Sequence, residues 1–286
     1  MLVKAIDVSI NNLKIDWKKV KRCGIGAAMV KASQGLSEVN PKTRLFMDGR
    51  FTQNVDGACA VGIHVGAYHY LTARTVEEAK EEARYFLSVL GLRRSSLTLW
   101  AAVDVESKYL PEDRMILTQI VLAFCDEVKS GGYTPCIYTN PSFMKYRLGD
   151  ISKYPLWLAL WGSNTAQWDA PQEVYAEQRK TQYPNAVMWQ WGAYKSGVIC
   201  GTECDGDYVL TDIAAKKTVS ASVQFKVGDK VKAVDSAVYT NGNAVPLWVR
   251  LLPLYVRGVN GENITVSVLK TGAVTGIVNQ KYLKKA

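Results

Sequence analysis

Short β-type runs alternate with helix-like stretches through the first 213 residues of this chain, and few folds accommodate such an order. Strands separated by helices are typical of a parallel sheet or of a barrel surrounded by helices. The candidate strands are as many as a (β/α) barrel needs, and they cover residues 3–9, 26–33, 64–70, 99–106, 134–140, 155–161, 186–191 and 205–210. We therefore predict an α/β fold with a TIM-like barrel in residues 1–213.

The predicted helices carry recognisable end signals. Residues 75–91 have Thr75 as an N-cap, apolar side chains at helical spacing and Gly91 as the stop. We expect the acidic residues of this helix to form a solvated face: Glu77, Glu78, Glu81 and Glu82. Residues 112–132 predict a second clear helix.

A shorter helix is predicted over residues 17–24, and we interpret Asp16 as its N-cap rather than as a catalytic acid. The last three candidate strands follow one another with little helical signal. We therefore expect an irregular barrel, regular at first and poor in helices later.

The character of the sequence changes after residue 213. Residues 214–222 are small and polar and predict a linker. Residues 223–286 contain short alternating runs separated by turn dipeptides, which is typical of a small SH3-like β barrel.

Positive charge is concentrated in this second domain. The net charge is +9, and +6 of it lies from residue 218 onward. A basic surface suits nucleic acid, an anionic membrane or an acidic wall polymer. The sequence has no RNP, zinc-finger or basic-helix pattern, so we expect neither a nucleic-acid nor a membrane partner.

The sequence carries only weak signals of a membrane, secreted, disulfide-linked or metal-binding protein. No apolar run approaches the roughly 18 residues of a membrane span, and the N-terminal segment lacks the zones of a signal peptide. The six cysteines are expected to be reduced core residues. Cys200 and Cys204 lie far in sequence from both histidines, so we expect no metal site and no cofactor.

Acidic residues stand at the ends of several candidate strands. On a strand, Asp104 and Glu106 share one face while Val103 and Val105 take the other. Two carboxyls about 7 Å apart between Cα atoms can couple, which raises one pKa and keeps that group protonated as a general acid. A strand-end aspartate can equally cap a loop or pair with a lysine.

Asp7 and Asp205 extend this pattern to the first and last candidate strands. The ends of barrel strands form the active-site face, and four like charges there would be costly for stability alone, which favours a functional site. Aromatic and polar side chains at strand ends suit sugar rings, although strand aromatics are often core residues. The candidate substrate-binding residues are Tyr68, Tyr70, Tyr138, Trp157, Trp189, Gln190 and Lys31.

Through these motifs the sequence resembles glycoside hydrolase family 25, the Chalaropsis-type lysozymes, which cut bacterial peptidoglycan as N-acetylmuramidases. The matching motifs occur in order: AIDVS, VKASQG, VGAYHY, AAVDVE, CIYTN, PLWLALW, MWQW and GTECDGDYVL. The resemblance implies that Glu106 is the general acid and that Asp104 orients or polarises the 2-acetamido group of the substrate. It also implies that Asp7 and Asp205 line the site.

Some positions depart from the family pattern. Gln34 stands where glutamate is usual, and Trp191 stands where tyrosine is common. We take Asp205, not Asp207, as the closing aspartate of the family, because the residue two positions later is often asparagine. The mechanism stays open between retention, inversion and attack by the acetamido oxygen of the substrate, and an Asp-x-Glu pair suits the last of these.

The basic second domain resembles the C-terminal wall-binding modules of bacteriophage endolysins. This resemblance implies anchoring to peptidoglycan or to anionic wall polymers. A phage lysin would stay in the host cytoplasm until it is released to the wall. The alternatives are a bacterial autolysin of the same chemistry and a catalytically silent protein that binds wall glycan.

Overall fold

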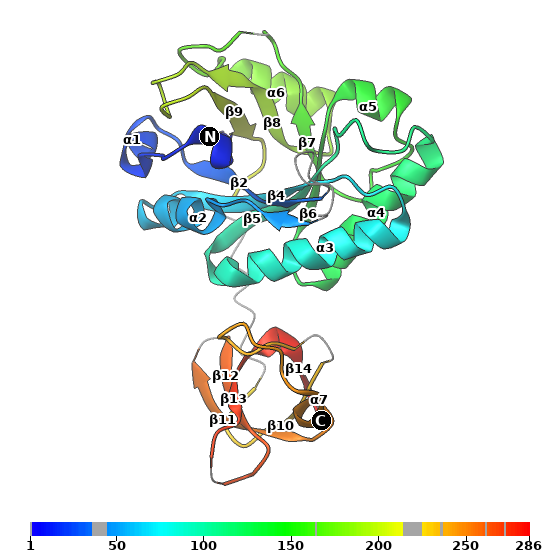
Figure 1. The fold of residues 1–286 in the computed structure, drawn as a ribbon. Helices are drawn as coiled ribbons and strands as arrows, with labels where there is room; N and C mark the ends of the chain where they lie inside the picture. The colour runs from blue at the N-terminus through cyan, green and yellow to red at the C-terminus, as the bar shows by residue number, and fades with distance from the viewer. Residues whose placement is uncertain are drawn as a thin grey trace. The chain divides into compact units, whose positions relative to one another are not determined.

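The computed structural model describes residues 2–35, 45–163, 165–213, 225–234, 237–260, 262–271 and 273–286. The chain divides into two compact units, Met1–Thr218 and Val219–Ala286 (Figure 1). The predicted linker, residues 214–222, lies outside the described residues.

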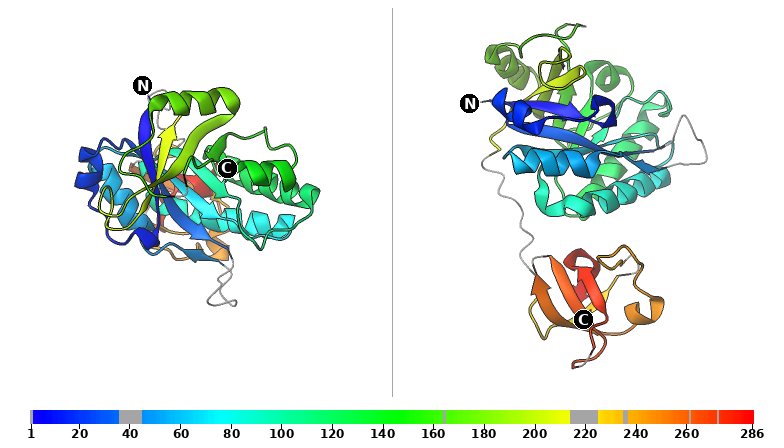
Figure 2. Two further views of the ribbon diagram at one scale, coloured as in Figure 1. Left: turned by 90° about the horizontal axis from the view of Figure 1, so that it is seen from above. Right: turned by 60° about the vertical axis from the view of Figure 1, so that its left-hand side comes forward.

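Within the described residues, the first unit is an α/β fold around a closed barrel of eight strands (Figures 1 and 2). The order is β1-β2-β4-β5-β6-β7-β8-β9, and the barrel closes where β9 pairs with β1. The strands are β1 (Val3–Val8), β2 (Ala27–Gln34), β4 (His64–Tyr70), β5 (Leu97–Asp104), β6 (Pro135–Thr139), β7 (Leu156–Ala159), β8 (Ala186–Tyr194) and β9 (Cys204–Val209). Strand β3 (Phe46–Met47) pairs with β2. The predicted α/β barrel is confirmed.

The last strand breaks the parallel pattern. β9 runs antiparallel to both β8 and β1, while the other barrel neighbours are parallel. A short loop without a helix joins β8 to β9, and such a connection makes neighbouring strands antiparallel. The expectation of a helix-poor end is wrong for α6 (Glu173–Gln182), which stands between β7 and β8. This helix buries Ala176 but exposes most of its charged residues, so its apolar periodicity is weak.

Helices surround the barrel: α1 (Trp17–Arg22), α2 (Phe51–Ala60), α3 (Val76–Leu90), α4 (Arg114–Ser130) and α5 (Pro141–Tyr146). The predicted N-caps are confirmed, since Thr75 Oγ1 accepts a hydrogen bond from Glu78 N at 3.2 Å and Asp16 Oδ1 accepts one from Lys19 N at 3.0 Å. Figure 1 shows α3 and α4 side by side. In the described parts of the chain, every helix is too short or too polar to cross a bilayer.

Side chains of the barrel strands alternate between two cores. The inner core contains Ala5, Ala27, Met29, Ala102, Cys136, Trp157, Met188 and Val209. Their neighbours along each strand pack outward against the helices: Ile6, Ala28, Val30, Val103, Ile137 and Leu158. The two-residue period of a strand therefore decides which side chains enter the barrel.

The predicted solvated face of α3 is wrong at Glu82. Its side chain is only 1% exposed, because it lies on the buried helix face with Ala79, Ala83 and Phe86. Glu77 is exposed as predicted.

The second unit is a small all-β body in its described residues. Its sheet has the order β13-β12-β11-β10-β14, with each neighbouring pair antiparallel. The strands are β10 (Lys230–Ala233), β11 (Leu254–Asn260), β12 (Asn263–Ser267), β13 (Gly276–Asn279) and β14 (Leu283–Lys285), with the short helix α7 (Leu247–Arg250) before β11. Alternating apolar residues of these strands form one core that includes Val231, Leu254, Val256, Ile264, Val266 and Val278.

Candidate active site

Carboxyl groups gather at one end of the barrel, and we call Asp7, Asp104, Glu106, Asp205 and Asp207 the acid cluster. Asp7 lies near the end of β1, and Asp104 is the last residue of β5. Asp205 lies directly opposite Asp7 on the neighbouring strand β9. The charge of Glu106 acts on Asp205, which places the β5 acids close to the β9 acids. The structure therefore brings the four predicted acids together and adds a fifth.

Asp104 and Glu106 form the first pair. Val103 and Val105 pack in the outer core, so the two acids share the inner face as strand alternation predicts. Asp104 is 6% exposed, and burial raises its pKa well above the usual value, with a further rise from the charge of Glu106. Glu106 is exposed beyond the strand, yet partial desolvation by the surrounding protein still raises its pKa. The pair can therefore stay protonated at a pH closer to neutrality than ordinary carboxyls can.

Lys31 is the cation beside this pair. Its Nζ atom donates a hydrogen bond to Gln34 Oε1 at 2.6 Å and lies 5.1 Å from the centre of the Tyr70 ring. Burial lowers the pKa of Lys31, while the charges of Asp104 and Glu106 oppose this shift. In turn, the positive charge lowers the pKa of both acids. Lys31 thus limits how strongly the pair binds its proton.

Gln190 links Asp7 of the acid cluster to two aromatic side chains. Its Nε2 atom donates to Asp7 Oδ2 at 2.9 Å, and its Oε1 atom accepts from Tyr138 Oη at 2.9 Å and from Trp161 Nε1 at 2.8 Å. An indole N–H can only donate, so these contacts fix the orientation of the amide. Asp7 is 7% exposed, and burial together with Asp205 and Asp207 raises its pKa well above the usual value.

Asp205 and Asp207 form a second pair on β9. Burial and the charge of Glu106 raise the pKa of the half-buried Asp205 to about 6. Asp207 is fully buried, and its Oδ1 atom accepts a hydrogen bond from Trp157 Nε1 at 2.7 Å. Burial raises the pKa of Asp207 to about 8. Sequence reasoning passed over Asp207, although its two-residue spacing from Asp205 repeats the spacing of Asp104 and Glu106.

Aromatic rings form the inner wall beneath the acids. Trp157 contacts Tyr138 and Tyr68 edge to face, with ring centres 4.6 and 5.9 Å apart. Burial and the nearby carboxylates raise the pKa of Tyr68 well above its usual value, so its hydroxyl stays protonated. With Tyr70 beside Lys31, six of the seven predicted substrate-binding residues lie on the inner face near the acids.

The structure does not bring Trp189 to the acid cluster. Trp189 belongs to the outer core, where its ring stacks on Tyr208 and lies 5.6 Å from the guanidinium carbon of Arg179 on α6. The reason is strand alternation, because its neighbour Gln190 points inward. The prediction that Trp189 contacts substrate is therefore corrected, and Trp161, which binds Gln190, takes a place at the site.

In the part of the chain that the structure describes, no three His, Cys, Asp or Glu side chains are grouped to hold a metal ion. The site consists of paired carboxyls, phenols and an amide around an exposed glutamate. Such a set can donate a proton and stabilise positive charge on a neutral, oxygen-rich substrate.

Residues 6–199 match the family model described as glycosyl hydrolases family 25. The chain belongs to this family. The match contains the acids of β1 and β5 but ends before β9. Asp205 and Asp207 are therefore assigned to the same barrel by the pairing of β9 with β1 and β8.

The chain is also similar to two lysozymes and to a solved endolysin structure. The autolytic lysozyme of Clostridium acetobutylicum is 30% identical over 169 residues, which are 59% of this chain and 48% of that protein. Lysozyme M1 of Streptomyces globisporus is 28% identical over 218 residues, 72% of this chain and 66% of that protein. The chain thus matches about half to two thirds of the length of these relatives. Among solved structures, the CTP1L endolysin is 26% identical with a TM-score of 0.56, and the match covers 75% of this chain and 70% of that one.

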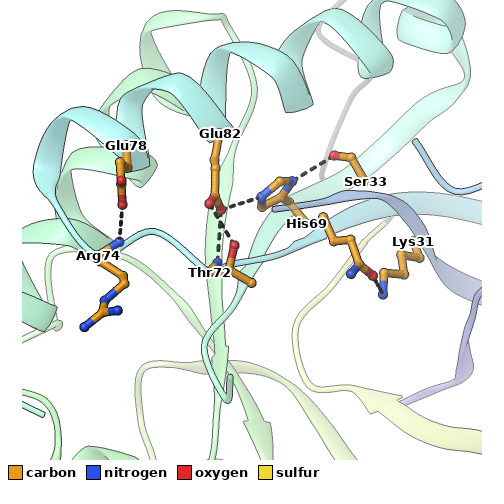
Figure 3. Close-up of polar contacts among 8 residues, drawn as sticks. Lys31, Ser33, His69, Thr72, Arg74, Glu78 and Glu82 are labelled. Carbon is orange, nitrogen blue, oxygen red and sulfur yellow. Dashed lines mark hydrogen bonds and ion pairs between the residues drawn. The ribbon is translucent and has the colours of Figure 1, made fainter. Parts of the chain in front are cut away.

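A buried polar network supports the family 25 site from behind (Figure 3). His69 Nδ1 lies 2.8 Å from Ser33 Oγ, and His69 Nε2 lies 2.9 Å from Glu82 Oε2. Thr72 donates to the same carboxylate from its backbone N at 3.1 Å and from its hydroxyl at 3.0 Å. Ser33, His69 and Glu82 are at most 1% exposed, so this Ser-His-Glu set is closed to substrate. It ties β2 and β4 to α3, and those two strands carry Lys31 and Tyr70.

Proposed function

We propose that the chain is a muramidase, which hydrolyses the β-1,4 bond between N-acetylmuramic acid and N-acetylglucosamine in bacterial peptidoglycan. The observation that carries the proposal is the Asp104–Glu106 pair, two carboxyls on one face at the end of β5 with raised pKa values. Glycoside hydrolysis needs a protonated carboxyl at the leaving oxygen and a second group that stabilises the developing positive charge. The family supports the proposal, since the relatives named above are lysozymes and an endolysin.

In the proposed reaction, Glu106 gives its proton to the glycosidic oxygen as the bond breaks. Its exposed position leaves it accessible to a polymer, and its raised pKa favours the protonated form. After the first step, the ionised Glu106 takes a proton from the attacking water and returns to its starting state.

Asp104 acts on the substrate's 2-acetamido group in this proposal. The residue keeps 6% of its surface exposed, and its Oδ1 atom takes no hydrogen bond from the described residues, so the carboxylate has capacity left to accept one from the acetamido N–H. That bond turns the acetamido oxygen toward the anomeric carbon, where it attacks as the sugar–oxygen bond breaks. In this proposal the pair keeps one proton, which lies on Glu106 before the bond breaks. Asp104 is then ionised, and its negative charge stabilises the oxazolinium ion that results.

The test compares wild-type protein with Glu106→Gln on purified bacterial walls, with exposed Glu112→Gln as the matched control. We expect wild type and control to clear the walls and to leave muramic acid at the new reducing ends, while Glu106→Gln keeps little activity. If all three proteins bind walls and none clears them, the acid cluster is a binding site and the enzyme proposal is wrong.

The stereochemical course of the proposed reaction can be tested separately. Attack by the acetamido oxygen followed by water retains the anomeric configuration. Proton NMR of the first sugar released should therefore detect the retained anomer. Initial release of the inverted anomer would contradict the role given to Asp104.

We propose further that the second unit anchors the enzyme to the wall as an SH3-like module. Most of the net positive charge lies from residue 218 onward, which suits anionic wall polymers. Tethering raises the effective concentration of the barrel at an insoluble substrate. Such a pair of domains fits a phage lysin, and the autolytic lysozyme relative favours a bacterial autolysin as the second candidate. Fractionation of producing cells separates them: a phage lysin accumulates in the cytoplasm before lysis, and an autolysin is found at the growing wall.

A further inference from the structure

Asp7 and Asp207 are diagonal neighbours on adjacent strands. In the antiparallel pair β1–β9, Ala5 lies opposite Asp207 and Asp7 lies opposite Asp205. Diagonal residues on one face of such a pair are within reach of each other's side chains. Both side chains are buried, with exposed fractions of 7% for Asp7 and 0% for Asp207.

Each of the two acids is held by one donor from another strand. Trp157 Nε1 on β7 donates to Asp207 Oδ1, and Gln190 Nε2 on β8 donates to Asp7 Oδ2. Asp207 Oδ2 is buried and accepts no hydrogen bond from a donor among the described residues. Each carboxyl acts on the pKa of the other, so the two groups lie close together. A hydrogen bond between them needs a proton on one of the two, because two ionised carboxylates have none to donate.

The surroundings disfavour a second negative charge on this pair. The charge of Asp205 on β9 acts on both acids, and the pair in turn acts on Tyr68 of β4, Tyr138 of β6, Tyr194 of β8 and the thiol of Cys204. Each of these groups is neutral or negative, so none compensates an additional anion. Two carboxyls that share a buried site keep one proton between them for this reason.

We propose that Asp207 is a positioning residue that shares one proton with Asp7, and that this proton holds the Asp7 carboxyl against Gln190 at the edge of the acid cluster. The role in catalysis rests on the proposed muramidase function. Loss of the shared proton places two like charges side by side. Asp7 then swings away from Gln190, and the added charge disturbs Asp205 and, through it, Glu106.

The variants that test this are Asp207→Asn and Asp207→Leu. Asparagine can still accept from Trp157 through Oδ1 and donate to Asp7 from Nδ2, as a protonated aspartate does. Leucine has a similar size but offers neither bond. Circular dichroism and thermal unfolding of both variants establish that they are folded before any comparison.

The direct readout is the protonated carboxyl itself, detected at neutral pH by infrared or by ¹³C NMR of aspartate-labelled protein. We expect the difference spectrum between wild type and Asp207→Asn to contain the signal of one protonated carboxyl. A difference spectrum with ionised carboxylate signals alone would overturn the shared proton.

The kinetic readout uses wall fragments at neutral pH. We expect Asp207→Asn to keep kcat within about threefold of wild type, and Asp207→Leu to lose at least about tenfold in kcat with little change in KM. Equal kcat for Asp207→Leu and wild type would overturn the positioning role. The infrared or NMR spectrum is recorded without substrate, so it tests the shared proton independently of the muramidase function. The muramidase function fails separately, if wild type itself releases no sugar.

Discussion

Gln190 donates a 2.9 Å hydrogen bond to Asp7, although the two residues come from β8 and β1 and lie on opposite sides of β9. The amide spans the antiparallel strand that closes the barrel. Its oxygen is held in turn by Tyr138 and Trp161. The position of Asp7 therefore depends on two other strands, β8 and β6, and on the loop that follows β7.

Replacing Gln190 by leucine should impair catalysis far more than replacing the residue before it. Gln190→Leu leaves Asp7, Tyr138 and Trp161 without a shared partner, and each lost bond to a buried polar group costs about 1–3 kcal/mol. We expect at least about a tenfold loss in kcat on wall fragments. Trp189→Phe, which changes the outer face of the same strand, serves as the control and should keep wild-type kcat. Equal losses in both variants would contradict the assignment of faces.

Removing the charge of Lys31 should move the pH profile. Lys31 lowers the pKa of Asp104 and Glu106, so Lys31→Met should raise both pKa values further. The proposed acid must be protonated, and its activity is lost as pH rises through its pKa. The alkaline limb of kcat against pH should therefore shift upward by about half a unit or more. Lys80→Met on the exterior of α3 is the control, and a downward shift in Lys31→Met would refute the charge arrangement.

The shared proton on Asp7 and Asp207 should be visible in stability as well as in spectra. The pKa of Asp207 in the folded state, about 8, lies above its value in the unfolded chain, so the folded state binds more protons between these values. Stability linked to this group is complete below about pH 4 and is lost as pH rises toward 8. Denaturant unfolding should find that Asp207→Asn gains at least about 1 kcal/mol relative to wild type between pH 5 and pH 8, which corresponds to one pKa unit. A pH-independent difference would contradict the prediction.

The buried network around Glu82 should contribute strongly to stability. Glu82→Ala removes one of the two hydrogen-bond partners of His69 and the carboxylate that accepts from the N–H and the hydroxyl of Thr72. Each buried polar group left unsatisfied costs about 1–3 kcal/mol. The control is Glu77→Ala on the exposed face of the same helix, whose effect should stay within about 0.5 kcal/mol. Denaturant titration of the three proteins measures both values. A loss below about 1 kcal/mol for Glu82→Ala would mean that the network is dispensable.

Deletion of the second unit should separate wall binding from chemistry. A chain that ends at Thr218 retains the acid cluster, so its kcat on soluble wall fragments should match that of the whole chain. Its sedimentation with intact walls should fall, and more strongly at low salt, where charge attraction contributes most. Unchanged sedimentation would refute the anchoring role.

Period-two spacing allowed the placement of Asp104 and Glu106 to be predicted from the sequence. Val103 precedes Asp104, and Val105 lies between the two acids. Because these valines take one face of the strand, the alternation assigns both acids to the other face. Trp189 and Gln190 were harder, because both residue types suit a sugar site and both lie on one strand. Only the pairing of β8 with its neighbours decides that Gln190 points inward.

The burial of Asp207 and of Glu82 could not be predicted for a different reason. Acids are mostly exposed in proteins, so a buried acid is predicted only when its partner is known. The partners here, Trp157 for Asp207 and His69 for Glu82, lie 50 and 13 positions away in sequence. Helix α6 escaped prediction because it buries little apolar surface and is stabilised by packing against β8.

The closure of the barrel by β1 and β9 also has a consequence for the order of folding. The first and last strands of the unit supply Asp7 and Asp205, which meet as direct neighbours only after almost the whole unit has been synthesised. Contacts between such distant parts of a chain form late, because a long loop must close before they are gained. A ribosome-bound chain that lacks β9 therefore has neither a closed barrel nor an assembled acid cluster, and activity begins only when the final strand is inserted.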